Sequence, residues 1–189
     1  WLSSVGVDFQ MNRTYNARGV FDGDGNQDGW LLGLHRKVEL FGSANQAGSY
    51  VIRTAGDGSE LRMDWDAASQ SYRTTQGGGA HDSLIINGAG QFEWQDGSSR
   101  IKEIYHAQGH LLRIEDSQGN ATTLNYQNNR LHEILTTVVD RGLSTQTTTL
   151  NYNSAGLLAS IRTASDQSDA LTTVYYDYDG QNRLQRVRF

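Results

Sequence analysis

Four oxygen-bearing side chains alternate along one short acidic segment, residues 22–29. They are Asp22, Asp24, Asn26 and Asp28. Oxygen ligands at alternate positions of a loop are how proteins hold Ca²⁺, so these four residues are the candidate metal ligands. The EF-hand pattern also requires Gly at its sixth position and Glu at its twelfth, where this chain has Gln27 and Gly33. The alternative is a solvated turn whose Asp and Asn side chains bond their own backbone.

Two histidines, His106 and His110, are four residues apart, and His132 follows further along the chain. On a helix, a spacing of four would place two imidazoles together for zinc. Gly109 lies between the first two, however, and predicts a turn. A zinc site also needs three or four converging ligands, so we expect histidines on the surface of a hairpin.

Paired carboxylates occur at Asp64/Asp66 and at Asp177/Asp179. Residues i and i+2 share one face of a strand, so each pair could share a proton as hydrolase carboxylates do. Both pairs lie beside expected turns, which favours a structural role. The sequence has no Gly-x-Ser-x-Gly, His-Glu-x-x-His or Walker motif. We therefore expect no catalytic residue and no enzymatic activity.

The aromatic residues allow two interpretations. Trp30, Trp65, Trp94 and the tyrosines could form a platform on which sugars stack, or they could fill cross-strand pairs in a sheet. Cross-strand aromatic pairs each contribute up to about 1 kcal/mol. We expect most of these side chains to form such pairs.

Composition limits the partners of the chain. Its 16 basic and 21 acidic residues give a net charge of -5, which argues against a nucleic-acid surface. No apolar run approaches the roughly 20 residues of a membrane span. There is no Cys, which excludes disulfides and thiolate zinc sites, and apart from calcium no cofactor is expected. The start at Trp1, without Met, predicts a piece of a longer polypeptide.

Short runs with alternating or β-branched residues, bounded by turn residues, predict strands at 38–41, 49–54 and 60–65. In the last of these, Leu61, Met63 and Trp65 share one face of the strand. No window holds a sustained helical stripe. With 21 Gly and no Pro, the chain is predicted to be all-β, with many tight turns.

The second half of the chain contains a repeated set of residues, in which a Tyr is followed by a Leu and then by an Ile or Val. The copies are Tyr105, Gly109, Leu111, Ile114; Tyr126, Leu131, Ile134; Tyr152, Gly156, Leu158, Ile161; and Tyr178, Leu184, Val187. Thr-rich runs precede the last three tyrosines. Each copy therefore predicts a hairpin in which one strand ends at the Tyr and the next begins at the Leu.

The spacing does not decide which face of the strand the Leu and the Ile or Val of each copy occupy. A Leu and an Ile or Val three residues apart cannot share a face of a flat strand. Either a bulge or twist brings them to one face, or one of them faces the other side. A repeat of this kind buries its apolar face by stacking on its neighbours.

These residues resemble the YD repeats of the RHS family. The closest matches are residues 114–120 and 176–184, and residues 8–18 with Gly29-Trp30 resemble the segment that opens many RHS shells. The resemblance is strong over the last ninety residues and over 8–30, and weak between about 40 and 95. Two features depart from the family: Tyr126 and Tyr152 lack a following Asp, and the Asp-Pro-type motif near the end of the shell is missing because Pro is absent.

The resemblance implies an antiparallel sheet of hairpin repeats that is part of a curled shell. Residues 1–95 would open the shell, and residues 96–189 would form four YD-type hairpins. In this family such shells enclose a C-terminal toxin, in bacterial polymorphic toxins and insecticidal toxin complexes, whereas a related barrel in animal teneurins serves adhesion.

The function implied is structural: a wall segment, secreted or on a bacterial cell surface, that encapsulates a toxin or effector. Its partners would be the rest of the same polypeptide and the enclosed toxin. The alternative is a module for cell-surface adhesion or carbohydrate binding, with a surface glycan or protein as its partner.

Overall fold

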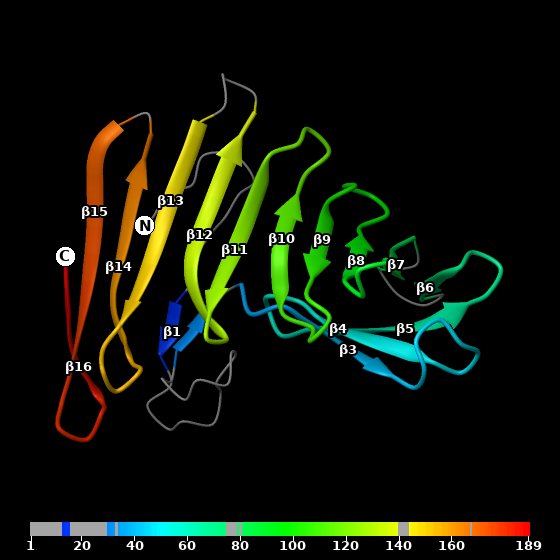
Figure 1. Cartoon of the computed structure of the whole chain (residues 1–189), viewed down its shortest axis with the longest axis horizontal. Helices are drawn as coiled ribbons and strands as arrows, with labels where there is room; N and C mark the ends of the chain where they lie inside the picture. Colours follow the sequence, from blue (N-terminus) through cyan, green and yellow to red (C-terminus); the bar gives the residue numbers. More distant parts are fainter. Residues whose placement is uncertain are drawn as a thin grey trace. The chain divides into compact units, whose positions relative to one another are not determined.

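The computed structural model describes residues 13–15, 30–32, 34–74, 79, 81–139, 144–166 and 168–189. Within these ranges the chain forms β-strands and no α-helix, which confirms the all-β prediction (Figure 1). Strands β3 to β16 follow one another in chain order in a 14-stranded sheet, and β1 and β2 pair separately. In the described part of the chain, no helix is long and apolar enough to cross a membrane.

The chain divides into two compact units. Residues 33–119 form one, called here the central unit. Residues 1–32 and 120–189 form the other, called here the hairpin unit. The expected division of the chain at residue 95 stays a prediction.

The central unit is built of eight short antiparallel strands. They are β3 (Lys37–Phe41), β4 (Tyr50–Thr54), β5 (Glu60–Asp66), β6 (Ser71–Arg73), β7 (Ser83–Ile86), β8 (Phe92–Gln95), β9 (Lys102–Tyr105) and β10 (Leu111–Glu115). Strand β5 shows the alternation predicted from its sequence. Met63 is fully buried and Leu61 and Trp65 are half-buried, whereas Glu60, Arg62 and Asp64 on the other face are exposed.

A glycine turn fixes one contact within the central unit. Gly109 has a φ of +96° in the β9–β10 turn, and its carbonyl accepts a hydrogen bond of 2.9 Å from the backbone N–H of Val38 in β3. A Cβ at this position would lie 2.1 Å from the Val38 carbonyl oxygen. Only glycine combines this backbone conformation with so close an approach.

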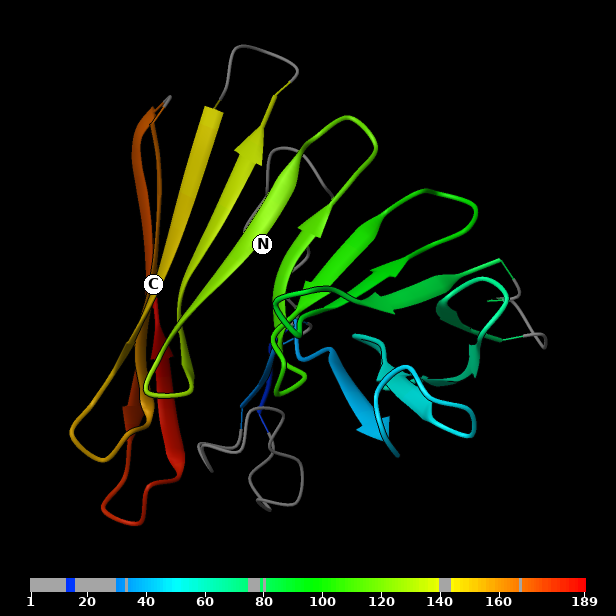
Figure 2. The same ribbon diagram turned by 45° about the vertical axis from the view of Figure 1, so that its right-hand side comes forward.

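The hairpin unit contains β1 (Arg13–Tyr15) and β2 (Trp30–Leu32), which pair with each other, and six longer strands. The longer strands are β11 (Ala121–Gln127), β12 (Arg130–Val138), β13 (Ser144–Tyr152), β14 (Leu158–Ser165), β15 (Ser168–Tyr178) and β16 (Leu184–Arg188). They form three successive antiparallel hairpins, and the view in Figure 2 shows their twist. The hairpins predicted from the repeated Tyr and Leu are therefore present.

A β-bulge determines which face of the strand the Leu and the Ile of the repeat occupy. In the β11–β12 hairpin, Asn125 is opposite Glu133 but the next residue, Tyr126, is opposite Leu131, so His132 is an extra residue. The extra residue brings Leu131 and Ile134 to the same face, where each is 1% exposed. A bulge, rather than a change of face, therefore accounts for the spacing of three.

The same irregularity occurs in all four copies of the repeat. The extra residues are Leu112, His132, Ala159 and Gln185. Leu158 and Ile161 are each 1% exposed, like their counterparts in β12, but Val187 in the last strand is 39% exposed. Among the described strands, β16 is the last of the order, so none of them lies on its other side to cover that position.

Candidate functional site

Successive hairpins of the hairpin unit are joined by tyrosine side chains. The hydroxyl of Tyr152 in β13 donates a hydrogen bond of 2.8 Å to the carbonyl of Leu131 in β12. One hairpin further on, the hydroxyl of Tyr178 in β15 donates a bond of the same length to the carbonyl of Leu158 in β14. The repeat Tyr therefore fixes each of these hairpins to the one before it, and the acceptor is the repeat Leu.

A buried ion cluster lies in the central unit and was not predicted. The Glu103 carboxylate is fully buried and forms ion pairs with Arg36 and with Arg53, whose guanidinium is 2.6 Å away. Tyr105 donates a short hydrogen bond to the same carboxylate. Burial, followed by the nearby Glu103 carboxylate, raises the pKa of Tyr105 well above its usual range, so the phenol stays a donor. Arg53 also lies 3.7 Å from the ring centre of Trp94.

A comparison of the repeat copies indicates that Glu103 is buried. Two residues before the repeat Tyr, the other copies place Leu124, Leu150 and Tyr176, each opposite the repeat Ile or Val and each buried. Glu103 occupies this position in the first copy, opposite Ile114. A carboxylate at a core position requires a buried partner. Comparing the copies position by position would have identified the residue, although not its arginines.

The predicted carboxylate pair in β5 does not form a proton-sharing site. Asp64 is exposed and pairs with Arg62 at 2.7 Å. Asp66 accepts hydrogen bonds from the hydroxyl of Ser69 and from the backbone N–H of Ala68, and these bonds lower its pKa. Each carboxylate thus binds its own partners rather than the other carboxylate.

The carboxylates of the second pair, Asp177 and Asp179, also bind separate partners. Asp177 accepts two hydrogen bonds from Arg188 in β16, at 2.7 and 2.8 Å. Asp179 accepts bonds from the backbone N–H and guanidinium of Arg183 in the β15–β16 turn, which lower its pKa. Both carboxylates therefore stabilise the last hairpin.

His106 and His110 bracket the β9–β10 turn, as expected. Their rings stack with centres 4.6 Å apart, and burial, followed by the nearby His106, lowers the pKa of His110. Among the residues that the structure describes, no three His, Asp or Glu side chains gather in a way that could hold a metal. The calcium candidates Asp22, Asp24, Asn26 and Asp28 lie outside the described residues, so that site stays a prediction.

Trp65 forms a cross-strand aromatic pair of the kind expected from the sequence, and Trp94 packs against an arginine instead. Trp65 packs edge-on against Tyr72, directly opposite it on β6, with ring centres 5.2 Å apart. Trp94 is 6% exposed and lies beneath the Arg53 guanidinium. Their rings are therefore engaged in packing rather than arranged as an open platform.

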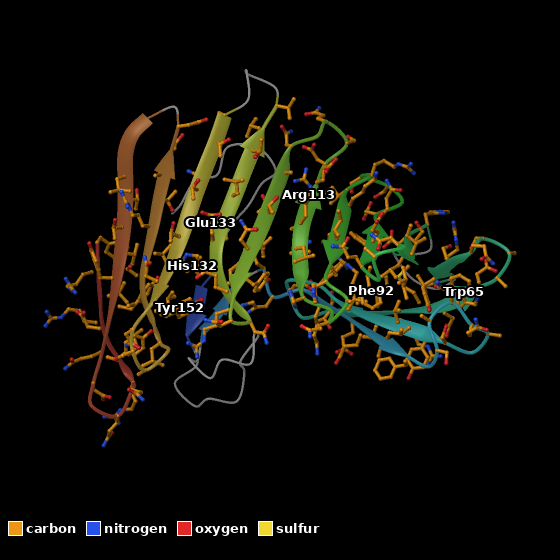
Figure 3. All side chains as sticks on the ribbon, viewed as in Figure 1. Trp65, Phe92, Arg113, His132, Glu133 and Tyr152 are labelled. Carbon is orange, nitrogen blue, oxygen red and sulfur yellow. The ribbon has the colours of Figure 1, made fainter. Side chains whose placement is uncertain are left out.

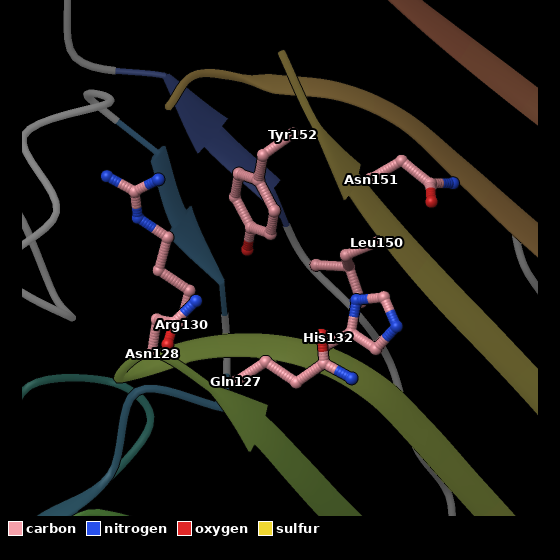
Figure 4. A pocket seen from close by; sticks show the side chains of 7 residues that line it. All are labelled: Gln127, Asn128, Arg130, His132, Leu150, Asn151 and Tyr152. Carbon is pink, nitrogen blue, oxygen red and sulfur yellow. The ribbon is translucent and has the colours of Figure 1, made fainter. Parts of the chain in front are cut away.

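A polar pocket of about 310 Å³ lies in the hairpin unit (Figure 4). Backbone pairing between β12 and β13 ends at Glu133 opposite Thr149, and residues 130–132 and 150–152 are not paired with each other. The pocket lies at this end of the ladder, where the bulge at His132 diverts β12. Its lining residues are Gln127, Asn128, Arg130, His132, Leu150, Asn151 and Tyr152.

Neither of the comparisons with known proteins identifies a relative. No family model matches the sequence, and no curated protein matches it.

Proposed function

We propose that this chain is a section of a β-sheet wall that encloses another polypeptide, such as a toxin or effector. The observation that carries the proposal is the tyrosine bond between successive hairpins, made by Tyr152 to Leu131 and by Tyr178 to Leu158. A unit that buries its apolar residues against an identical neighbour extends a sheet by repetition. The resemblance of the repeats to YD repeats supports the same function.

In this proposal the chain is not an enzyme. The carboxylates at positions 64, 66, 177 and 179 form ion pairs with arginines or hydrogen bonds within turns, which is a structural role. The partners are the rest of the polypeptide and the enclosed segment, and the location is outside the producing cell or on its surface.

Limited proteolysis of the natural polypeptide that contains this chain tests the proposal. We expect a segment outside these 189 residues to resist protease while the sheet is intact. Replacing Ile161 with Ala, which opens a cavity between hairpins, is expected to expose that segment. Val139→Ala, which shortens a 48% exposed side chain just after β12, is the control and is expected to leave the protection unchanged. Equal cleavage of the segment in the unchanged polypeptide and in both variants would count against an enclosing wall.

A further inference from the structure

The pocket beside the β11–β12 turn has a cation whose charge is not neutralised within the described residues. Arg130 makes no ion pair there, and its guanidinium lies 5.6 Å from the ring centre of Tyr152. It also packs closely against Gly156, where a Cβ would come within 2.5 Å of it. These contacts hold the guanidinium against the ring without supplying a carboxylate. An arginine in this setting is suited to a planar anionic group.

Three further polar side chains of the lining are also available. The side chains of Gln127, Asn128 and His132 make no hydrogen bond to the part of the chain that the structure describes. The bulge makes His132 the extra residue of β12, and Figure 3 shows it on the strand beside Tyr152. None of the described residues that line the pocket is Asp or Glu, so their electrostatics favour an anion over a cation.

Size and apolar surface narrow the ligand further. A pocket of about 310 Å³ is at the small end of ligand sites, which favours a small ligand. Leu150 and the Tyr152 ring supply apolar surface, and two amide side chains, of Gln127 and Asn128, offer both donors and acceptors. Amide side chains together with a single guanidinium fit a molecule that has several hydroxyls and one carboxylate.

We propose that this pocket binds a hexuronate, a pyranose ring that carries one carboxylate, with Arg130 at the carboxylate and the amide side chains at the hydroxyls. Tyr152 both lines the pocket and bonds to Leu131, but binding of a ligand here does not depend on the chain being a wall. Binding would give the hairpin unit affinity for acidic polysaccharides.

The test is calorimetric titration of the 189-residue chain with methyl glucuronide, with methyl glucoside, acetate and inorganic phosphate as comparison ligands. We expect methyl glucuronide to bind at least about tenfold more tightly than each of the other three, because only it offers both the carboxylate and the hydroxyls. Equal binding of methyl glucoside, acetate or phosphate would overturn the assignment, as would no binding of methyl glucuronide.

Variants locate the site. Arg130→Gln is expected to weaken the binding of methyl glucuronide about tenfold or more, since it removes a charge-assisted bond. Arg162→Gln, which changes an exposed arginine on β14 outside the pocket, is the matched control and is expected to bind as the unchanged chain does. If Arg130→Gln lowers the melting temperature, His132→Asn provides the second variant and is expected to weaken binding severalfold. Undiminished affinity in a folded Arg130→Gln or His132→Asn protein would contradict the proposal.

Discussion

The Tyr152 hydroxyl donates a hydrogen bond of 2.8 Å to the backbone carbonyl of Leu131, across the end of the β12–β13 ladder where backbone pairing stops. Tyr178 makes the equivalent bond to Leu158. The repeat Tyr therefore forms a hydrogen bond to the preceding hairpin as well as lying in its own. Each copy of the repeat thus carries the group that attaches it to its neighbour.

The first prediction concerns these hydroxyls. Tyr152→Phe and Tyr178→Phe are each expected to lower the free energy of unfolding by about 1 kcal/mol, the usual net value of one hydrogen bond. Urea denaturation measures the loss. Tyr175→Phe is the matched control, since Tyr175 is 44% exposed and stacks beside Arg188, and it is expected to change stability by less than about 0.5 kcal/mol. Equal effects of all three substitutions would show that the hydroxyl bonds do not join the hairpins.

The second prediction uses one repeat position in two environments. Ile161 is 1% exposed, and Ile161→Ala is expected to cost about 2–5 kcal/mol because it leaves a cavity. Val187 occupies the same position in the last copy but is 39% exposed, so Val187→Ala is expected to cost less than about 1 kcal/mol. Chemical denaturation of both variants checks the difference. Similar losses for the two would contradict the stacking of hairpins as the source of burial.

The third prediction concerns the buried ion cluster. Glu103→Gln leaves the Arg53 guanidinium buried without its counter-charge and is expected to lower the free energy of unfolding by about 3–5 kcal/mol. Glu60→Gln, at an exposed position of the same unit, is the control and is expected to change it by less than about 0.5 kcal/mol. A small effect of Glu103→Gln would mean that the cluster does not hold the central unit together.

The fourth prediction concerns pH. The Asp96 carboxylate accepts bonds from the backbone N–H groups of Ser99 and Ser98 and from the Ser98 hydroxyl. These bonds lower the pKa of Asp96 from 3.8 to about 2. Because the folded pKa lies below the unfolded one, the stabilisation is complete above the unfolded pKa and is lost as the pH falls toward the folded value.

Asp96→Asn keeps an acceptor oxygen but removes the charge. We expect the variant to be less stable than the unchanged chain at pH 7, and we expect the difference to shrink as the pH falls from about 4 to about 2. Urea midpoints measured across this range test the expectation. A stability difference that is constant with pH would rule out the carboxylate as its cause.

Local patterns in the sequence were sufficient to predict much of the fold. Alternation placed Met63 in the core, and the repeated Tyr and Leu located the hairpins. The bulge was not predictable because a spacing of three is compatible with two arrangements of a strand. The pairing of Glu103 with Arg53 spans fifty residues, and nothing local specifies it. The pocket depends on where the β12–β13 ladder ends, which is a property of the register.

The central claim is that these hairpins form a wall around another polypeptide. An electron cryo-microscopy map of the natural polypeptide that contains this chain tests it most directly. The account predicts that the hairpins continue into a wall and that density for a separate segment lies within the space the wall bounds. A map in which both faces of this sheet meet solvent, with no enclosed segment, would contradict the account.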